Sequence, residues 1–471
     1  MSIEKASVKV FSSSTFNTVV GFLGITFFAR ELGASQIGVF FLFEALLGML
    51  AIITDFGLAG AVEKRISEGM PGDEILGTAL AVKLVPVAVI AAVLVFVSDL
   101  VNGYLGAELA GLLLVGLVLR ELAETQQMVL SGELRVGETA IPDAARQVAW
   151  VGVGALLVVR GFGVIGLVYG LFVGWTVMFL WSWHRSETTI GRPTRRAWRS
   201  LFDFSKYHVI SKVQGYFYSW VDVVIIGLFL SQAAVGAYEV AWRITEAIVL
   251  LSNAVALAVL PKISEWHTGG RTDRVGKLVS NAIVPSVVFV IPALGGLLVL
   301  STDVLAVVFG PEYVIASLVL VILAGEKIFQ ALYRLFHRSL HGINRPDLAA
   351  RTVVLTLLTN VVLNLALIQL YGIEGIAVAT TVSFVLGTVL HWRDLAASVP
   401  LRFPTREVGW CLISAAVMTL GVWTVRRSLQ VDSMVVLVLL VAGGALLYGA
   451  LISTYGPLRR RLQQNIRAVL A

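Results

Sequence analysis

Long apolar runs follow one another along the whole 471-residue chain, separated by short polar segments. A helix needs about 20 apolar residues to cross the hydrocarbon core of a bilayer, and these runs have that length. Strands of a membrane β-barrel alternate apolar with polar residues over about 10 residues, so the longer continuous runs exclude a barrel. The sequence therefore predicts an all-α polytopic membrane protein with about 14 transmembrane helices, at 10–29, 37–60, 75–98, 106–131, 140–160, 163–183, 205–230, 235–260, 278–300, 312–334, 349–370, 374–394, 408–425 and 433–453.

The composition excludes a set of soluble domains. Hydrophobic residues make up 57% of the chain and charged residues 14%, against roughly 45–50% and 25% in ordinary soluble proteins. The net charge of +6 does not indicate a nucleic-acid partner, because membrane proteins collect Lys and Arg in their cytoplasmic loops. The first run begins after Lys5 and Lys9 and lacks a signal-peptidase cleavage pattern, so we interpret it as a retained helix.

The distribution of basic residues predicts the orientation of the chain. Most Lys and Arg residues precede the first run, follow the last, or lie in loops after even-numbered runs. The opposite loops hold only four, which are Arg30, Arg160, Arg426 and Arg427. Because basic loops stay in the cytoplasm, both termini are predicted to be cytoplasmic.

Short segments that occur twice in similar form divide the chain into two similar halves. The similar pairs are "GFGVIGLV" (161–168) with "YGIEGIAV" (371–378), "PDAAR" (142–146) with "PDLAAR" (346–351), and "RISE" (65–68) with "KISE" (262–265). They keep their order and fall at equivalent places in a six-helix unit, which indicates a repeat with both halves in the same orientation. The predicted domains are a six-helix lobe at 1–183, a basic cytoplasmic linker at 184–204, a second six-helix lobe at 205–394, and two further helices with a basic tail at 395–471.

No enzyme-like arrangement stands out in the sequence, so we expect no catalytic residue, no cofactor and no metal. The stretch 161–166 formally matches G-x-G-x-x-G, but it lies in a short turn between two apolar runs rather than after a strand. His337 and His341 have a ligand-like spacing without a third ligand nearby in the sequence. The single cysteine, Cys411, excludes an intrachain disulfide and a cysteine-based metal site.

Charged side chains inside the apolar runs are the best candidates for function, because a charge at the centre of a bilayer costs about 3 kcal/mol or more. One group lies at a similar depth in the outer half of the membrane and consists of Glu44, Asp222, Arg243 and Glu246. Asp222 and Arg243 are level on adjacent helices and are expected to pair, and Glu246 lies one turn from Arg243. The alternatives are snorkelling near a helix end and a purely structural ion pair.

A second group of charges lies deeper, at equivalent places in the two halves. Arg120 and Lys327 each begin a polar stripe whose members are three and four residues apart, and Lys212 lies in a similar stripe. Such spacing keeps a stripe on one face of its helix. Three stripes in equivalent helices predict a water-filled cleft between the halves. For Arg334 and other late members of the Lys327 stripe, a place at the cytoplasmic interface is the alternative.

The stretch 29–69 resembles the first helical hairpin of polysaccharide-biosynthesis flippases, an oligosaccharide flippase family in the superfamily that also holds multidrug exporters and lipid II flippases. The resemblance rests on three short motifs, which are Ala29-Arg30-Glu31-Leu32-Gly33, Gly38-Val39-Phe40 and Asp55-Phe56-Gly57-Leu58. The arrangement of six, six and two helices matches the same superfamily over essentially the whole chain. Arg243-Ile244-Thr245-Glu246 also resembles an Arg-x-x-Glu motif in the eighth helix of lipid II flippases.

The resemblance implies a flippase in the cell membrane that turns over a lipid-linked oligosaccharide, on a polyprenyl or dolichyl phosphate or diphosphate. In this family a V-shaped cavity between two lobes opens alternately to each side. Arg and Lys suit phosphate, so the expected substrate-binding residues are Arg243, Arg120, Lys327, Lys212 and Arg30. The expected coupling or ion-pairing residues are Glu44, Asp55, Asp222 and Glu246. The expected partners are the lipid-linked oligosaccharide, membrane lipids, H+ or Na+ as coupling ion, and glycan-assembly enzymes.

Two other functions remain open from the sequence. Acids at membrane depth outnumber bases, which keeps a cation-coupled multidrug exporter of the same superfamily as an alternative. Drug exporters often carry an acidic residue in the first helix, however, and the run 10–29 contains none. A non-transporting assembly protein is the third candidate, and it predicts polar stripes that are tightly packed or face lipid.

Overall fold

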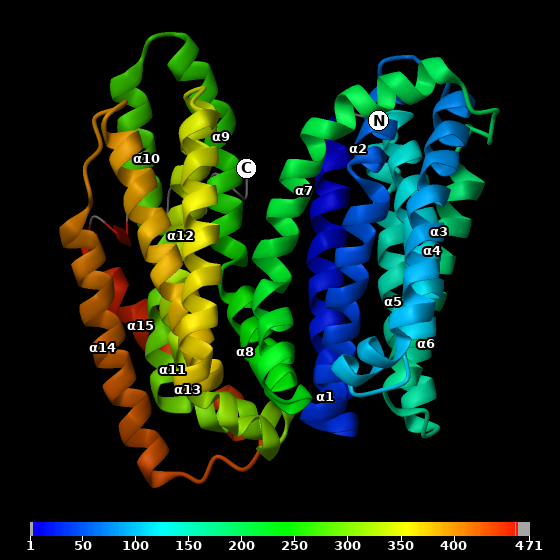
Figure 1. The fold of residues 1–471 in the computed structure, drawn as a ribbon. Coiled ribbons are helices and arrows are strands. Elements are labelled where there is room, and N and C mark those ends of the chain that lie inside the picture. Colours follow the sequence, from blue (N-terminus) through cyan, green and yellow to red (C-terminus); the bar gives the residue numbers. More distant parts are fainter. Residues whose placement is uncertain (1–2, 457, 460–471) are drawn as a thin grey trace. The chain divides into compact units, whose positions relative to one another are not determined.

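The computed structural model describes residues 3–456 and 458–459, apart from the side chains of 3–8, 10, 11, 207–214, 218 and 251. Within these residues the chain forms helices and turns, with no strand. It divides into two compact units, Met1–Gly236 and Ala237–Ala471, called unit 1 and unit 2 below (Figure 1). The all-α fold is confirmed.

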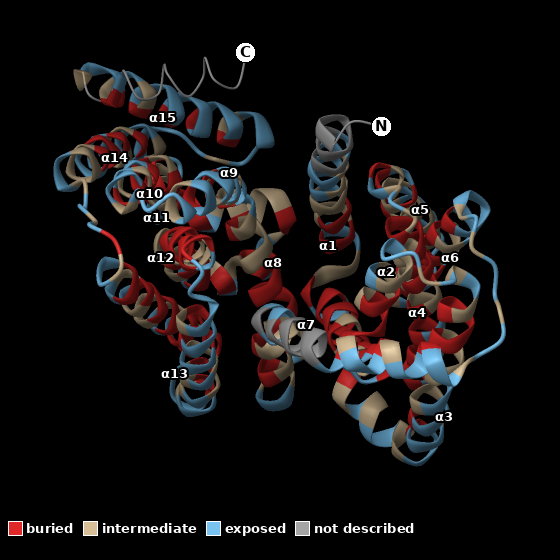
Figure 2. Cartoon of the chain, turned by 90° about the horizontal axis from the view of Figure 1, so that it is seen from above, coloured by how far each residue is buried: buried red, intermediate tan, exposed pale blue. Residues whose placement is uncertain are grey.

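Unit 1 is built around a central helix, α4. Its helices are α1 (Ile3–Asp55), α2 (Leu58–Ser67), α3 (Gly72–Leu105), α4 (Ala110–Gly132), α5 (Ala140–Val159), α6 (Gly163–Arg185), α7 (Arg195–Phe229) and the start of α8 (Gln232–Ile248), with a 3-10 turn, η1 (Val136–Glu138). The central helix contacts α1, α2, α3 and α6. Seen from above, these helices surround it and turn their buried faces toward it (Figure 2). Polar groups on α4 are therefore held in the interior of unit 1.

Unit 2 is built in the same way around α12 (Ser317–Gly342). Its other elements are α9 (Leu250–Thr268), α10 (Thr272–Val287), α11 (Val290–Val304), the π-helical turn η2 (Leu305–Phe309), the 3-10 segment η3 (Pro311–Ala316), α13 (Pro346–Ala396), α14 (Thr405–Ser428) and α15 (Met434–Thr454). Helix α12 contacts α9, α10, α11 and α13. The stripe that begins at Lys327 therefore lies on the central helix of unit 2.

The helices have the length and composition of membrane spans. Among the described residues, eight helices are long and apolar enough to cross a bilayer, or nine if α8 and α9 form one bent span. Helices α1 and α13 each contain two predicted spans, separated at Gly33 and Gly372 by non-helical backbone with positive φ. Every predicted span coincides with helix over most of its length, although 37–60, 235–260 and 278–300 each contain a short break between two helices. The chain is a multi-pass membrane protein. The count of fourteen crossings and the cytoplasmic termini stay predictions.

The division into lobes at 204/205 also stays a prediction. Helix α7 begins at Arg195, and within unit 1 it contacts α1, α2 and α3. The segment before it follows α3, where the backbone N–H of Gly191 donates to the carbonyl oxygen of Asp73 at 2.9 Å. The segment 184–204 thus makes ordered contacts with the start of α3.

Close packing in unit 1 depends on glycine where the start of α8 crosses α1. A Cβ atom at Gly38 would lie 1.7 Å from the carbonyl oxygen of Gln232, and one at Gly236 would lie 2.1 Å from that of Ala34. Such distances are far below van der Waals contact, so only glycine fits at these two positions. The crossing fixes the start of the helix that carries Arg243 and Glu246.

Candidate functional site

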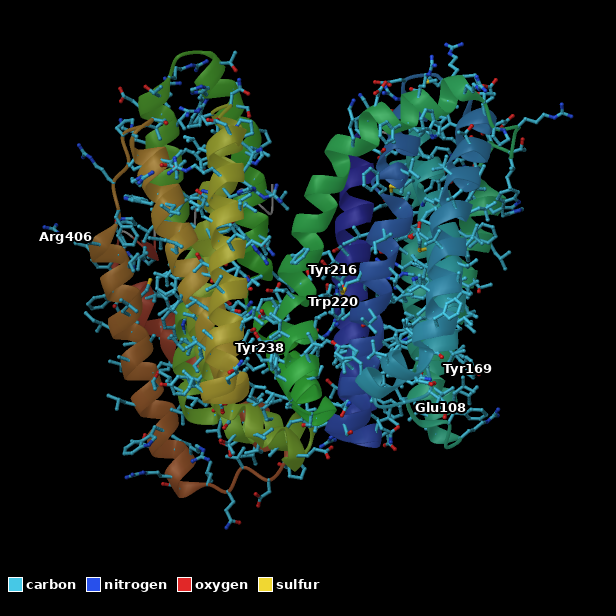
Figure 3. The ribbon with its side chains drawn as sticks, in the orientation of Figure 1. Glu108, Tyr169, Tyr216, Trp220, Tyr238 and Arg406 are labelled. Carbon is cyan, nitrogen blue, oxygen red and sulfur yellow. The ribbon has the colours of Figure 1, made fainter. Side chains whose placement is uncertain are left out.

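A polar pocket of about 450 Å³ lies inside unit 1. Charged side chains reach it from four helices, with Glu44 on α1, Glu63 on α2, Arg120 and Glu124 on α4, and Asp143 and Arg146 on α5. Gln127, Met128, Trp175 and Trp220 also line it. Figure 3 labels Trp220 on α7, one turn from Tyr216, whose hydroxyl donates to the carbonyl oxygen of Ala45 on α1. An apolar unit thus holds a polar interior space.

Both arginines of this pocket are paired with carboxylates. The Nε of Arg120 lies 2.7 Å from an oxygen of Glu124, one turn along α4. The Nη2 of Arg146 lies 3.1 Å from Asp143, which also accepts a hydrogen bond of 2.6 Å from the amide of Asn17. Four carboxylates and two guanidinium groups leave the pocket without an excess of positive charge. Such a surface offers both hydrogen-bond donors and acceptors, which suits hydroxyl groups.

A buried ion triad lies beside the pocket. The Nζ of Lys83 on α3 lies 2.9 Å from Asp55 at the end of α1 and 2.6 Å from Glu121 on α4, and it donates to the hydroxyl of Thr125 at 2.7 Å. Glu121 also accepts a hydrogen bond from Thr54 at 2.9 Å. All three charged side chains are almost fully buried. Because unpaired buried charges are strongly unfavourable, each member depends on the others.

Asp55 has a second task at the turn from α1 to α2. Its carboxylate accepts the backbone N–H groups of Gly57 at 3.0 Å and Ala59 at 2.9 Å, which lie at the start of α2. Phe56 and Gly57 have positive φ there, and a carboxylate at a helix N-terminus is favoured by the helix dipole. The predicted coupling or ion-pairing residue Asp55 therefore joins the turn to the buried ions.

A second ionic cluster lies in unit 2, between the end of α8 and the face of α12. Lys327 Nζ lies 2.9 Å from Glu246 Oε1 and 3.0 Å from Glu326 Oε2. Gln330 Nε2 donates to Glu246 Oε1 at 3.2 Å, and Arg334 Nη2 lies 3.4 Å from Glu246 Oε2. Lys327 and Glu326 are fully buried, whereas Glu246 and Arg334 are 33% and 24% exposed. The cluster thus has a buried end at Lys327 and Glu326 and a partly exposed end at Glu246 and Arg334.

Two further residues of α8 border this cluster. The Nζ of Lys327 lies 3.7 Å above the centre of the Trp242 ring, a cation–π contact that holds the ammonium from a second side. Arg243 points to Glu239, and its Nε lies 3.1 Å from that buried carboxylate. The side chain of Arg243 is 35% exposed.

The structure brings some of the predicted site residues together and leaves others apart within each unit. Glu44 and Arg120 share the pocket of unit 1, and Glu246 and Lys327 form an ion pair in unit 2. Arg30 is exposed on α1, and Asp222 is buried on α7. The side chain of Lys212 lies outside the described residues, and the Asp222–Arg243 pair stays a prediction.

Sequence reasoning gave no role to several residues of these clusters. Lys83, Glu121 and Glu326 are charged residues within apolar runs, without a motif that assigns them a role, and Trp175, Trp220 and Trp242 have no distinguishing sequence signal. The partners of Lys83 are 28 and 38 positions away in the sequence, on other helices, so helical periodicity within α3 does not reveal them. The spacing in the sequence does, by contrast, indicate that Arg334 belongs to the polar stripe that begins at Lys327.

The histidines of unit 2 also come together. Nδ1 of His337 lies 3.4 Å from Nε2 of His391, and the ring of His341 contacts that of His337 in a tilted arrangement, with centroids 4.8 Å apart. The third histidine comes from α13, which the spacing on α12 could not show. Among the described residues, no group of three or more histidines, cysteines or carboxylates has the geometry to hold a metal ion.

Comparisons with known proteins agree with this architecture. A family described as "Polysaccharide biosynthesis protein" matches residues 27–319. The chain is 45% identical over 466 residues to the probable low-salt glycan biosynthesis flippase Agl15 of Haloferax volcanii, a match that covers 99% of both chains. It is 30% identical over 471 residues to the probable flippase AglR of the same organism, covering 98% of each.

Solved structures show the same fold at low sequence identity. The lipid II flippase MurJ in an inward closed conformation aligns with a TM-score of 0.79 and 17% identity, covering 95% of this chain and 98% of that one. An inward-facing multidrug resistance transporter of the MATE family, in the MOP superfamily, aligns with a TM-score of 0.61 and 15% identity, covering 81% and 95%. Since the family match and the two Haloferax relatives extend over most or all of the sequence, the chain belongs to the polysaccharide biosynthesis protein family.

Proposed function

We propose that this chain is a flippase, which moves a lipid-linked oligosaccharide from the cytoplasmic to the outer leaflet by alternating access through a polar cavity. Two relatives that match nearly the whole chain are named as flippases, one of them in glycan biosynthesis. The carrier would be a polyprenyl or dolichyl phosphate or diphosphate in the plasma membrane. Moving a lipid headgroup makes and breaks no covalent bond, so the chain would act as a transporter and not as an enzyme.

The observation that carries this proposal is the polar pocket within the apolar helices of unit 1. Sugar hydroxyls and phosphates lose their hydration when they enter hydrocarbon, at a cost of several kcal/mol for each unpaired group. A pocket lined by Arg120, Glu124, Gln127 and Trp220 supplies replacement hydrogen bonds and an aromatic surface. The apolar lipid tail can stay in the bilayer meanwhile.

The proposal gives the charged residues different tasks. Arg120, Arg30, Lys212, Arg243 and Lys327 would contact the headgroup. Glu44, Asp55, Asp222 and Glu246 would pair with these bases or bind the coupling ion, H+ or Na+. Glycan-assembly enzymes, which make and use the lipid-linked sugar, are the proposed protein partners.

Reconstituted vesicles test the proposed function directly. A polyprenyl diphosphate that carries a fluorescent oligosaccharide is placed in both leaflets, and an impermeant quencher bleaches the outer leaflet. Vesicles with the protein should then lose the remaining fluorescence at least about tenfold faster than protein-free vesicles, because unaided transfer must dehydrate the headgroup. Equal rates would contradict the flippase.

The same vesicles distinguish a flippase from a multidrug exporter. A cationic dye such as ethidium is trapped inside and a proton or sodium gradient is applied. The flippase predicts dye efflux no faster than in protein-free vesicles. Gradient-driven dye efflux without movement of the lipid-linked sugar would favour the multidrug exporter.

A further inference from the structure

We propose that the carboxylate of Glu246 occupies a phosphate-binding site of unit 2, and that a phosphate group of the lipid-linked substrate binds Lys327 and Arg334 by displacing it. This inference rests on the proposed function, because it assigns the phosphate end of that substrate to a place in the fold. It gives Glu246 a task different from coupling, namely that of an internal competitor.

Three hydrogen-bond donors of α12 converge on this one carboxylate. Lys327 Nζ and Gln330 Nε2 reach Oε1 at 2.9 and 3.2 Å, and Arg334 Nη2 reaches Oε2 at 3.4 Å. The donors are three and four residues apart, so they form a row along one face of the helix. An ammonium, an amide and a guanidinium in a row form a cradle for an anion with several oxygen atoms.

A phosphate group can use every donor that Glu246 now uses. Carboxylate and phosphate both accept charge-assisted hydrogen bonds from Lys and Arg, and Arg binds either with two parallel N–H groups. Phosphate has more acceptor oxygens and, as a diphosphate, more charge than a carboxylate. The cradle therefore favours the substrate once Glu246 has moved away, and Glu246 fills the cradle in its absence.

The cradle would keep its shape and charge when Glu246 leaves. Lys327 is fully buried, and it stays held by Glu326 at 3.0 Å and by the ring of Trp242 at 3.7 Å. Arg334 stays held by Asn253 on α9, whose Oδ1 accepts from its Nη1 at 2.6 Å. These contacts position both bases without help from Glu246, which is the feature expected of a preorganised site.

Exposure shows the side from which an anion can enter. Glu246 is 33% exposed and Arg334 is 24% exposed, whereas Lys327 has no exposed surface. An incoming phosphate would therefore meet Arg334 and Glu246 first and reach Lys327 last. Glu246 lies two residues before the end of α8, where the chain bends by 49° into α9. Displacement of Glu246 would break its contacts with α12 next to this bend. Substrate binding would thereby be coupled to a change in the position of α8.

Binding of inorganic pyrophosphate to the purified full chain in detergent tests the inference. Titration calorimetry at low salt is carried out on the wild type, on Glu246→Gln, and on Glu265→Gln as a control. Glu265 is an exposed carboxylate on α9, so its loss changes the net charge of the protein equally without touching the cradle. We expect Glu246→Gln to bind pyrophosphate about tenfold more tightly or better, because the neutral amide competes poorly for two cations, and Glu265→Gln to match the wild type.

A second substitution tests whether the gain in pyrophosphate affinity depends on Arg334. Arg334→Gln in the Glu246→Gln background should abolish the gain in affinity, while leaving the protein folded because Arg334 is partly exposed. Equal affinity of the wild type and Glu246→Gln, or a gain that survives Arg334→Gln, would overturn the inference. Sugar transport in vesicles is a separate readout. If Glu246→Gln binds pyrophosphate more tightly but the wild type transports no sugar, the anion site stands and the flippase proposal fails. If the wild type transports sugar but Glu246→Gln binds pyrophosphate no more tightly, the flippase proposal stands and the anion site fails.

Discussion

Replacement of Lys83 by methionine is expected to destabilise unit 1 by about 3–5 kcal/mol, the range measured when one partner of a buried ion pair is removed. The side chain of Lys83 is buried between Asp55 and Glu121. Methionine has a similar length but no charge, so the two carboxylates would face each other without a cation. Asp55 also holds the start of α2, so the loss would spread to the turn after α1. Thermal unfolding in detergent, followed by size-exclusion fluorescence, measures the effect.

Two further variants test whether the loss of stability comes from the unpaired buried carboxylates. Lys64→Met removes an exposed lysine that pairs with Glu68 at 3.2 Å on the surface of α2, and it should change stability by less than about 1 kcal/mol. Adding Asp55→Asn and Glu121→Gln to Lys83→Met should restore part of the lost stability, since no buried charge would then remain. If Lys83→Met unfolds at the same temperature as the wild type, the triad does not hold unit 1 together.

Replacement of Arg243 by alanine is expected to abolish sugar translocation, with a fall of at least about 100-fold, while the protein still inserts into the membrane. The Arg243 side chain is 35% exposed and its Nε lies 3.1 Å from Glu239, so an anion can reach the exposed part of this cationic side chain. Contacts of Arg with phosphate are charge-assisted, and each good one contributes about 1.5–3 kcal/mol. The vesicle assay measures the rate, and size-exclusion chromatography checks folding.

The matched control for Arg243 is an arginine that serves no proposed site. Arg345→Ala removes an exposed arginine that pairs with Asp347 at 3.1 Å at the start of α13, and transport should continue at the wild-type rate. Arg243→Lys should transport at an intermediate rate, because lysine keeps the charge and loses the planar pair of donors. Full transport by Arg243→Ala would remove this residue from the mechanism.

The helices of this protein could be predicted from its sequence because the bilayer demands long apolar segments. Every predicted span coincides with helix over most of its length, and the breaks at Gly33 and Gly372 fall between predicted spans. Interruptions within spans were harder to predict. The break between α8 and α9 at Val249 lies inside an apolar run, where no proline or glycine marks it, and tertiary packing decides it.

The charged side chains could be located in the sequence, but most of their partners could not. The pair Arg120–Glu124 follows from the spacing of i and i+4 on one helix. The pair Glu246–Lys327 joins residues 81 positions apart, and the triad around Lys83 joins three helices. Such contacts depend on which helix faces pack together, and a single sequence does not contain that information.

The most direct measurement asks whether water and substrate reach the pocket of unit 1. The chain has one cysteine, Cys411, which is buried, so Cys411→Ala gives a background without thiols. In that background Gln127→Cys or Met128→Cys places a thiol in the pocket, and Phe96→Cys places one on the exposed apolar face of α3. The protein is then treated in vesicles with a membrane-impermeant thiol reagent.

The pocket thiols are expected to react, because thiolate forms where water is present, and added lipid-linked oligosaccharide should slow their labelling about tenfold or more. The thiol at position 96 should stay unlabelled under both conditions. Unreactive thiols at 127 and 128, or labelling that the substrate does not slow, would contradict a polar pocket that receives the substrate.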